Sequence, residues 1–250
     1  MIKLGEINIS SVKLGDSNIS KVYQGEALIF GGGQPPIEAK LPDDTLYNYR
    51  GKNFSEDLLG IKTDKGSPGS LNYSGGSYAM NGNYLTLSNN PQFEPAIQSN
   101  ILNMFDSEPA LTIMFSAYPD SNTNNSSDII SNRSTESNYN YMLRNYTGGT
   151  YLHGLSNYQN YTLAENDLGD VIMLQVDENS VAKLTNVTKG ISTEEFNVQW
   201  GESSTNYTMF YANYSSQNVE HWSGEFGWIF CCKRKITEEE IQQVIAFNSK

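Results

Sequence analysis

The chain of 250 residues has few of the residue types on which catalysis and metal binding most often depend. It contains two cysteines, two histidines and no apolar run long enough to span a membrane. Cys231 and Cys232 are adjacent, so on a strand their side chains point to opposite faces, and a disulfide between them would be strained. We therefore expect two free thiols, at least one in the core, as in a protein that folds in a reducing cytoplasm.

Several functional motifs are also missing from the sequence. No His/Cys spacing suits zinc, no glycine-rich nucleotide-binding motif is present, and no Gly-x-Ser-x-Gly elbow accompanies His153 or His221. The sequence has no charged segment followed by an apolar run, so no secretory signal is predicted. The formal net charge of −12 disfavours nucleic acid and anionic membrane surfaces as partners.

The residues that are abundant favour an all-β fold. The chain has 16 tyrosines and 10 phenylalanines, with β-branched segments separated by Gly, Asn and Ser turns. Many short strands with regular turns predict a sandwich or jelly roll. The predicted strands are 46–50, 77–80, 83–88, 110–118, 127–132, 139–146, 150–154, 171–177, 181–186, 206–212 and 224–231.

Three near-copies of a ten-residue unit open the chain: IKLGEINIS, VKLGDSNIS and VYQGEALIF. Each unit is expected to form a short strand, a glycine turn and a second short strand. About thirty residues cannot bury a core alone, so residues 1–30 are predicted to be an anchoring and oligomerisation module. Residues 31–36 form a Gly/Pro linker, and 37–250 form the main domain. The repeated positions are Ile2, Gly5, Ile9, Val12, Gly15, Ile19, Val22, Gly25 and Ile29.

One helix is predicted at the carboxyl end of the sequence. Thr237 and Glu240 have the spacing of a capping box, and acidic residues fill the first turn. Ile241, Val244 and Ile245 follow at helical spacing, so this short helix should pack one face against the sheet.

The order of these segments resembles the concanavalin A-like jelly-roll family, which includes laminin G and pentraxin domains. The resemblance covers roughly residues 40–250 and rests on DTLYNYRGKNF, SYAMNGNYLTLSN, PALTIMFSAYPD, DVIMLQVDENSVAKLTNVTKG and, best matched, WSGEFGWIFCCKRKITEEEIQQV. It implies a lectin-like β-sandwich with a short helix at the end.

The decapeptide repeats resemble segments at the start of tailed-bacteriophage virion proteins, where they serve for attachment or trimerisation. Together the two resemblances imply a capsid decoration, head-fibre or tail-fibre protein that is assembled in the host bacterial cytoplasm. Its expected partners are other virion proteins, bound through residues 1–30, further copies of itself as a trimer or dimer, and a cell-surface or mucus glycan. A decoration protein without a ligand is an alternative.

The second alternative is a glycoside hydrolase that acts on β-glucans, since some members of this fold class cleave them. The nearest approach to their carboxylate motif is Glu165–Asp170, where the last position is Asp and Gly169 indicates a turn. We interpret this stretch as a solvated acidic turn and expect no enzyme activity. No cofactor is expected. Structural calcium is a further hypothesis, with Asp120, Asp128, Asp177 and Glu178 as candidates by position, Asp177 first.

Clustered aromatic residues are the remaining signal for a ligand. Flat aromatic faces combined with amide and hydroxyl groups suit sugars, although such rings are also common in a sandwich core. The candidate glycan-binding residues are Tyr139, Tyr141, Tyr146, Tyr151 and Trp222.

Overall fold

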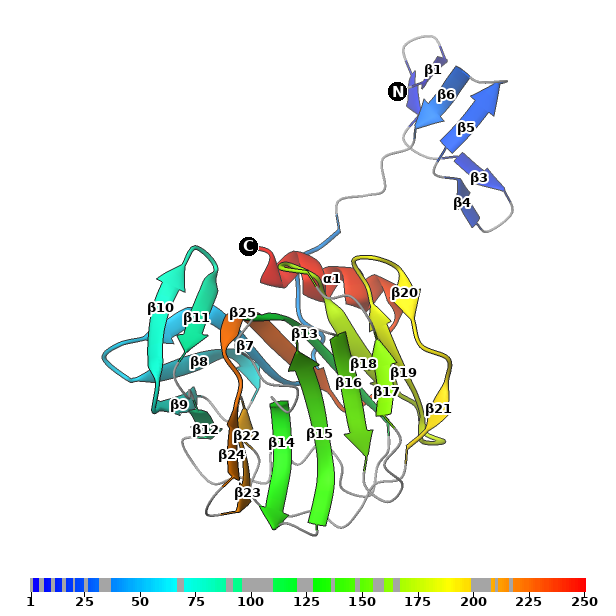
Figure 1. Ribbon diagram of the computed structural model, residues 1–250. Coiled ribbons are helices and arrows are strands. Elements are labelled where there is room, and N and C mark those ends of the chain that lie inside the picture. Colours follow the sequence, from blue (N-terminus) through cyan, green and yellow to red (C-terminus); the bar gives the residue numbers. More distant parts are fainter. Residues whose placement is uncertain are drawn as a thin grey trace.

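The structure is a computed structural model of the chain. It describes main chain and side chains over residues 37–66, 70–73, 75–88, 110–120, 167–198 and 222–250, and at Ile129. Elsewhere it describes only the main chain of the strands named below. The architecture is a β-sandwich with one helix near the end of the chain (Figure 1), which confirms the predicted all-β fold class.

The decapeptide repeats form three antiparallel hairpins. Ile2 pairs with Ile9 in the first hairpin and Val12 with Ile19 in the second, as the repeat predicts. In the third hairpin the register shifts after Val22, which pairs with Phe30 rather than with Ile29. The glycines Gly5, Gly15 and Gly25 lie outside the described residues. The hairpin strands are β1 (Ile2–Leu4), β2 (Ile7–Ile9), β3 (Val12–Leu14), β4 (Ser17–Ile19), β5 (Lys21–Gln24) and β6 (Ala27–Gly31).

A central sheet carries the helix on one of its faces and forms one layer of the sandwich. Its strands lie in the order β19, β18, β13, β25. Two further strands pair with the other edge of β25, one along each half of its length. The end of β25 pairs with β7, and its beginning pairs with β11. The bounds are β7 (Thr45–Ser55), β11 (Tyr84–Ser88), β13 (Leu111–Pro119), β18 (Ile172–Val176), β19 (Val181–Asn186) and β25 (Gly224–Cys232).

The remaining ladder continues from β7 through β8, β9, β12, β22 and β14 to β15, β16 and β17, and so forms the second layer (Figure 1). Strand β10 closes a hairpin with β11, β20 and β21 pair with β19, and β23 pairs with β24. The bounds are β8 (Gly60–Gly66), β9 (Ser70–Ser74), β10 (Ser77–Asn81), β12 (Gln92–Pro95), β14 (Asp128–Thr135), β15 (Asn138–Tyr146), β16 (Gly149–Gly154), β17 (Asn160–Leu163), β20 (Ile191–Ser192), β21 (Phe196–Asn197), β22 (Thr208–Met209), β23 (Tyr211–Ser215) and β24 (Asn218–His221).

Both faces of the central sheet are buried, because residue alternation sends side chains to two different cores. Ile113 and Phe115 of β13 pack in the main core inside the sandwich, together with Cys231 of β25. Met114 and Cys232 point the other way, into a smaller cluster under the helix. The adjacent cysteines therefore lie on opposite faces as predicted, and both are buried thiols that form no disulfide.

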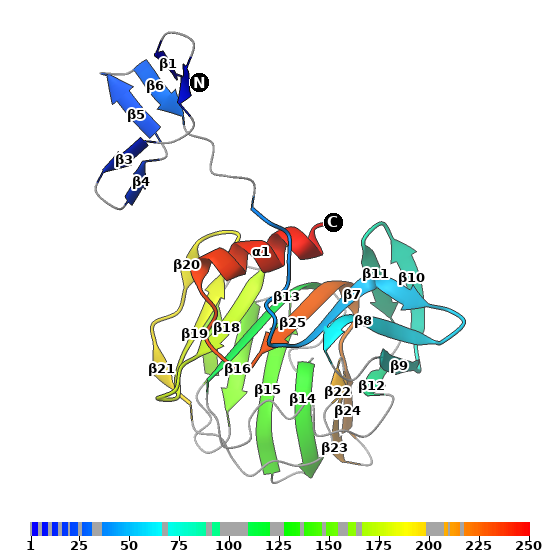
Figure 2. The same cartoon turned by 180° about the vertical axis from the view of Figure 1, so that it is seen from behind.

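Helix α1 (Glu238–Asn248) covers this outer face of the central sheet (Figure 2). The predicted capping box is present: the Glu240 N–H donates to Thr237 Oγ1 over 3.3 Å, and the Thr237 N–H donates to Glu240 Oε2 over 2.9 Å. Ile241 and Val244 are buried in the outer cluster. Arg234 binds Glu240 through Nη1 (2.8 Å) and Nη2 (2.6 Å) and Asp44 through Nε (2.5 Å), so ion pairs join the helix start to the segment before β7.

This helix is 11 residues long, and no helix in the described part of the chain has the length and apolarity needed to cross a bilayer.

Candidate functional site

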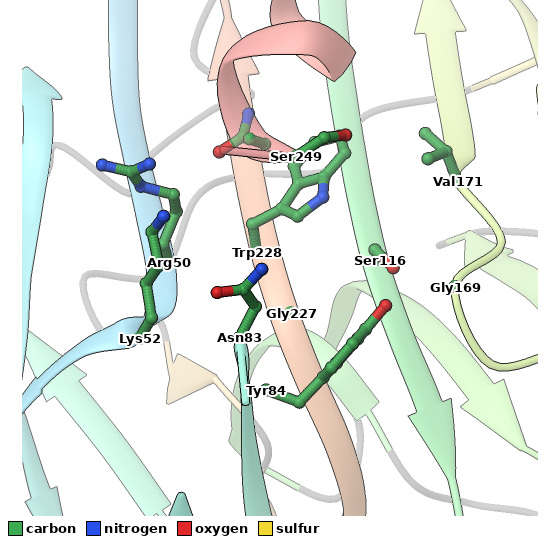
Figure 3. A pocket seen from close by; sticks show the side chains of 11 residues that line it. Arg50, Lys52, Asn83, Tyr84, Ser116, Gly169, Val171, Gly227, Trp228 and Ser249 are labelled. Carbon is green, nitrogen blue, oxygen red and sulfur yellow. The ribbon is translucent and has the colours of Figure 1, made fainter. Parts of the chain in front are cut away.

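A hollow of about 200 Å³ lies on the outer face of the central sheet, beside the end of helix α1 (Figure 3). We refer to it as the outer-face hollow. It is formed where six segments of the chain meet. The residues that line it are Arg50, Lys52, Asn83, Tyr84, Ser116, Gly169, Val171, Gly227, Trp228, Asn248 and Ser249.

A β-bulge in β25 creates the space. Ser116 of β13 pairs with Trp228, but the next residue, Ala117, pairs with Phe226, so Gly227 is the extra residue. A Cβ atom at Gly227 would lie 3.0 Å from the Ser116 carbonyl oxygen and 3.1 Å from Tyr84 Cε1. The absence of a side chain at Gly227 therefore lets the Tyr84 ring approach the main chain of the bulge. β-Bulges are common next to functional sites.

Two aromatic side chains supply the apolar part of the hollow. Trp228 is 6% exposed and packs in the outer cluster under the helix, while Tyr84 is partly exposed. Figure 3 shows them on neighbouring strands, with Gly227 between them. Aromatic surface with a few placed polar groups is the usual composition of a small-molecule site.

Arg50 forms a cationic side of the hollow and is held firmly in place. Its Nε donates to Asp64 Oδ2 over 2.9 Å, its Nη2 is paired with Asp64 Oδ1, and its guanidinium carbon lies 4.8 Å from the Phe247 ring centroid. Lys52 lines the same side. Burial and, second, the neighbouring Arg50 charge lower the pKa of Lys52, and Asp64 partly offsets them.

A buried amide pair fixes the helix end against β7. Asn48 Nδ2 donates to Asn248 Oδ1 over 3.0 Å, and Asn248 Nδ2 donates to Asn48 Oδ1 over 3.2 Å. Asn48 Nδ2 also lies 3.0 Å from Asp64 Oδ2, the oxygen that accepts from Arg50 Nε. Arg50 and the end of the helix are thus parts of one hydrogen-bond network. Asn83, Ser116 and Ser249 are further polar residues that line the hollow.

The sequence-predicted glycan residues are elsewhere. Tyr139, Tyr141 and Tyr146 belong to β15 and Tyr151 to β16, and their side chains lie outside the described residues. The main-chain register pairs Tyr141 with Gly154 and Arg144 with Tyr151.

Trp222 requires a correction, because its side chain is fully buried in the main core. It offers no exposed ring face on which a sugar could stack. The alternative weighed for these aromatic residues, packing in the sandwich core, describes this tryptophan.

Asp177, the first calcium candidate, organises a turn. Its Oδ1 accepts hydrogen bonds from the Asn179 N–H (2.9 Å) and the Val181 N–H (2.8 Å), at the connection between β18 and β19. Within the described residues no group of three or more His, Cys, Asp and Glu side chains is placed to hold a metal ion.

The acidic stretch before β18 is also structural where it is described. Asp170 is 5% exposed rather than solvated, and its Oδ2 accepts from the Asp167 N–H (2.9 Å) and from Asn186 Nδ2 (2.8 Å). Burial alone would raise the pKa of Asp170, but these hydrogen bonds and Lys189 outweigh it and the pKa is lowered. Glu165 lies outside the described residues.

Comparison with known proteins gives no family by sequence: no family model matches the chain, and no curated protein does. Solved structures do match its fold. The binding domain of botulinum neurotoxin DC, solved with SialylT, is 12% identical with a TM-score of 0.57, over 83% of this chain and 52% of that one. This chain thus spans about half of that structure's length.

Two further structures match. Domain 4 of an extracellular arabinanase from Geobacillus stearothermophilus, solved with arabinotriose, is 12% identical with a TM-score of 0.54, over 81% of this chain and 98% of that one. The Trypanosoma rangeli sialidase, solved with sialic acid, is 8% identical with a TM-score of 0.57, over 92% of this chain and 36% of that one. At these identities the likeness establishes the β-sandwich fold alone, and it is consistent with the concanavalin A-like class expected from the sequence.

Proposed function

We propose that residues 37–250 are a carbohydrate-binding domain whose ligand occupies the outer-face hollow, and that the chain is a bacteriophage virion structural protein that displays this domain. The observation that carries the binding part is the composition of the hollow. It combines the Tyr84 and Trp228 rings with two cations and with amide and hydroxyl groups, which together suit the apolar faces and hydroxyls of a sugar.

The size of the hollow limits the ligand. A volume of about 200 Å³ is smaller than the roughly 300–1,000 Å³ of sites that enclose drug-sized molecules. It therefore suits one sugar unit, with the rest of a glycan outside. Three matched structures were solved with SialylT, arabinotriose and sialic acid, which are ligands of those proteins and support a saccharide as the class to test first.

Binding without hydrolysis fits this site better than catalysis does. A glycosidase needs two carboxyl groups on either side of the bond that it cleaves. Among the described residues that line the hollow there is no Asp or Glu. We therefore propose no catalytic step.

The repeats supply the display part of the proposal. Strands β1 to β6 form three short hairpins, the last strand ending at Gly31, and residues 32–36 separate them in sequence from the domain. Attachment of many copies to one particle would raise avidity by about 10²–10⁴ over a single weak site. We propose that this occurs on a virion assembled in the host bacterial cytoplasm, with the first thirty residues bound to other virion proteins.

The binding part is tested with the full chain on a panel of immobilised neutral and acidic oligosaccharides. Gly227→Ala puts a methyl group into the hollow, 3.0 Å from the Ser116 carbonyl oxygen, and should abolish binding. This tight contact should also lower the unfolding temperature, so binding is measured well below the unfolding temperature of the variant. Tyr84→Leu should weaken binding, whereas Tyr78→Leu, in a ring cluster with Phe54 and Tyr73, should not. Saccharide binding that survives Gly227→Ala unchanged would move the site elsewhere, and a parent chain that binds no saccharide would refute the function.

The display part has a separate test. Particles assembled with a chain that lacks residues 1–31 should not incorporate the domain, whereas the full chain should be incorporated. Equal incorporation of both chains would show that the repeats are not the attachment module.

A further inference from the structure

The outer-face hollow is locally cationic in a chain that is strongly anionic overall. The formal net charge is −12, yet the charged side chains lining the hollow in the described part of the chain are Arg50 and Lys52. Asp64 forms an ion pair with Arg50 and so neutralises one of the two charges. The hollow therefore retains about one uncompensated positive charge, which would not be needed to bind a neutral sugar.

Asp64 orients Arg50 but does not use all of its hydrogen-bond donors. Its Nε and Nη2 donate to the two carboxylate oxygens of Asp64, and the Phe247 ring restrains the guanidinium plane. A guanidinium has five N–H donors, and Nη1 donates to no acceptor among the described residues. A charged donor held by a buried carboxylate and an aromatic ring is pre-organised, so binding an anion would cost little side-chain entropy.

Lys52 lies on the same side of the hollow and has no ion-pair partner among the described residues. Its side chain is partly exposed, and repulsion by the Arg50 charge is one cause, after desolvation, of its lowered pKa. An anionic group between the two side chains would relieve this repulsion. It would also bring the pKa of Lys52 back toward its ordinary value.

We propose that the outer-face hollow selects a saccharide that carries an anionic group, which lies between Arg50 and Lys52 while the sugar ring lies against Tyr84, next to the small exposed part of Trp228. This inference rests on the proposed carbohydrate-binding function and narrows its ligand class. A carboxylate, a sulfate and a phosphate share the required chemistry. The small volume, together with the overall negative charge, disfavours an extended polyanion such as nucleic acid.

The experiment measures binding of the full chain by calorimetry to matched pairs of acidic and neutral sugars. The pairs are trigalacturonate and its methyl ester, sialyllactose and lactose, and galactose 6-sulfate or 6-phosphate and galactose. In at least one pair the acidic member should bind about tenfold or more tightly than the neutral one, and added salt should weaken this preference. The pair that shows it identifies the source of the anion.

Lys52→Gln should weaken binding of the preferred acidic sugar about tenfold, which corresponds to about 1.4 kcal/mol, and should weaken binding of its neutral partner much less. Lys183→Gln removes an exposed lysine on β19 and is the matched control, with no expected change. Equal affinity for acidic and neutral members in every pair, or an unchanged acidic preference in Lys52→Gln, would overturn the inference while leaving the proposed function intact. Absence of binding to any saccharide would overturn both.

Discussion

Packing of helix α1 on the outer face of the central sheet gives the sharpest prediction about stability. Ile241 is 4% exposed and lies in the cluster that contains Trp228, Phe230 and Val244. Ile241→Ala removes buried methyl and methylene groups and leaves a cavity between helix and sheet. Such truncations cost about 2–5 kcal/mol of unfolding free energy. The cost should fall near the middle of this range, because the helix lies at the surface and its partners can partly relax.

The matched control is Ile191→Ala on β20. Ile191 is 42% exposed, so the same chemical change removes little buried surface and should shift stability by no more than about 0.5 kcal/mol. Both variants are compared with the parent in urea and in thermal unfolding. A chain of this size loses roughly 2–4 °C in Tm for each kcal/mol.

The outcome of this comparison bears on the site as well as on the fold. Asn248 and Ser249 at the helix end line the hollow, so a helix that did not pack on the sheet could not complete it. Equal stability of Ile241→Ala and Ile191→Ala would refute the packing of α1 on the outer face, and with it this description of the hollow.

Three further predictions concern the helix start and the thiols. Thr237→Ala should lower the unfolding free energy by about 0.5–2 kcal/mol, and Thr237→Ser should restore most of it, as urea unfolding can measure. Hydrogen bonds from Arg234 lower the pKa of Glu240 from 4.5 to about 2, so its contribution to stability is complete above pH 4.5 and lost as the pH falls toward 2; Glu240→Gln should show a smaller acid loss over that window, and an identical loss would contradict the ion pair. Burial raises the pKa of Cys231 and raises that of Cys232 to about 12, so neither thiol should react with a thiol reagent at neutral pH until urea unfolds the chain, and fast native labelling would contradict their burial.

The fold was predictable wherever local pattern and burial coincide. The strand expected over 110–118 is observed as Leu111–Pro119 and that over 224–231 as Gly224–Cys232, because each is a long run of apolar residues buried on both faces. The capping box predicted the helix start, since its hydrogen bonds are local. Strand β8, with the sequence GIKTDKG, was not predicted, because its glycines and charges match no strand pattern and its pairing with β7 is tertiary.

The outer-face hollow could not be predicted in the same way. It depends on the register of β13, β25, β7 and β11, which places Ser116, Gly227, Arg50 and Tyr84 together across long sequence separations. One local signal was present: Gly227 interrupts an otherwise apolar buried strand, and a glycine there often marks a bulge or a close approach. Clustering of tyrosines along the sequence pointed to β15 and β16, whose side chains lie outside the described residues.

The most direct test of the central claim, that the outer-face hollow binds the sugar, is the mapping of amide chemical shifts in the full chain during titration with the saccharide that binds best. The perturbed amides should cluster at Arg50, Lys52, Tyr84, Gly227 and Trp228 and at the end of α1. A cluster on β15 and β16, around Tyr139, Tyr141, Tyr146 and Tyr151, with no change at the hollow, would contradict the account.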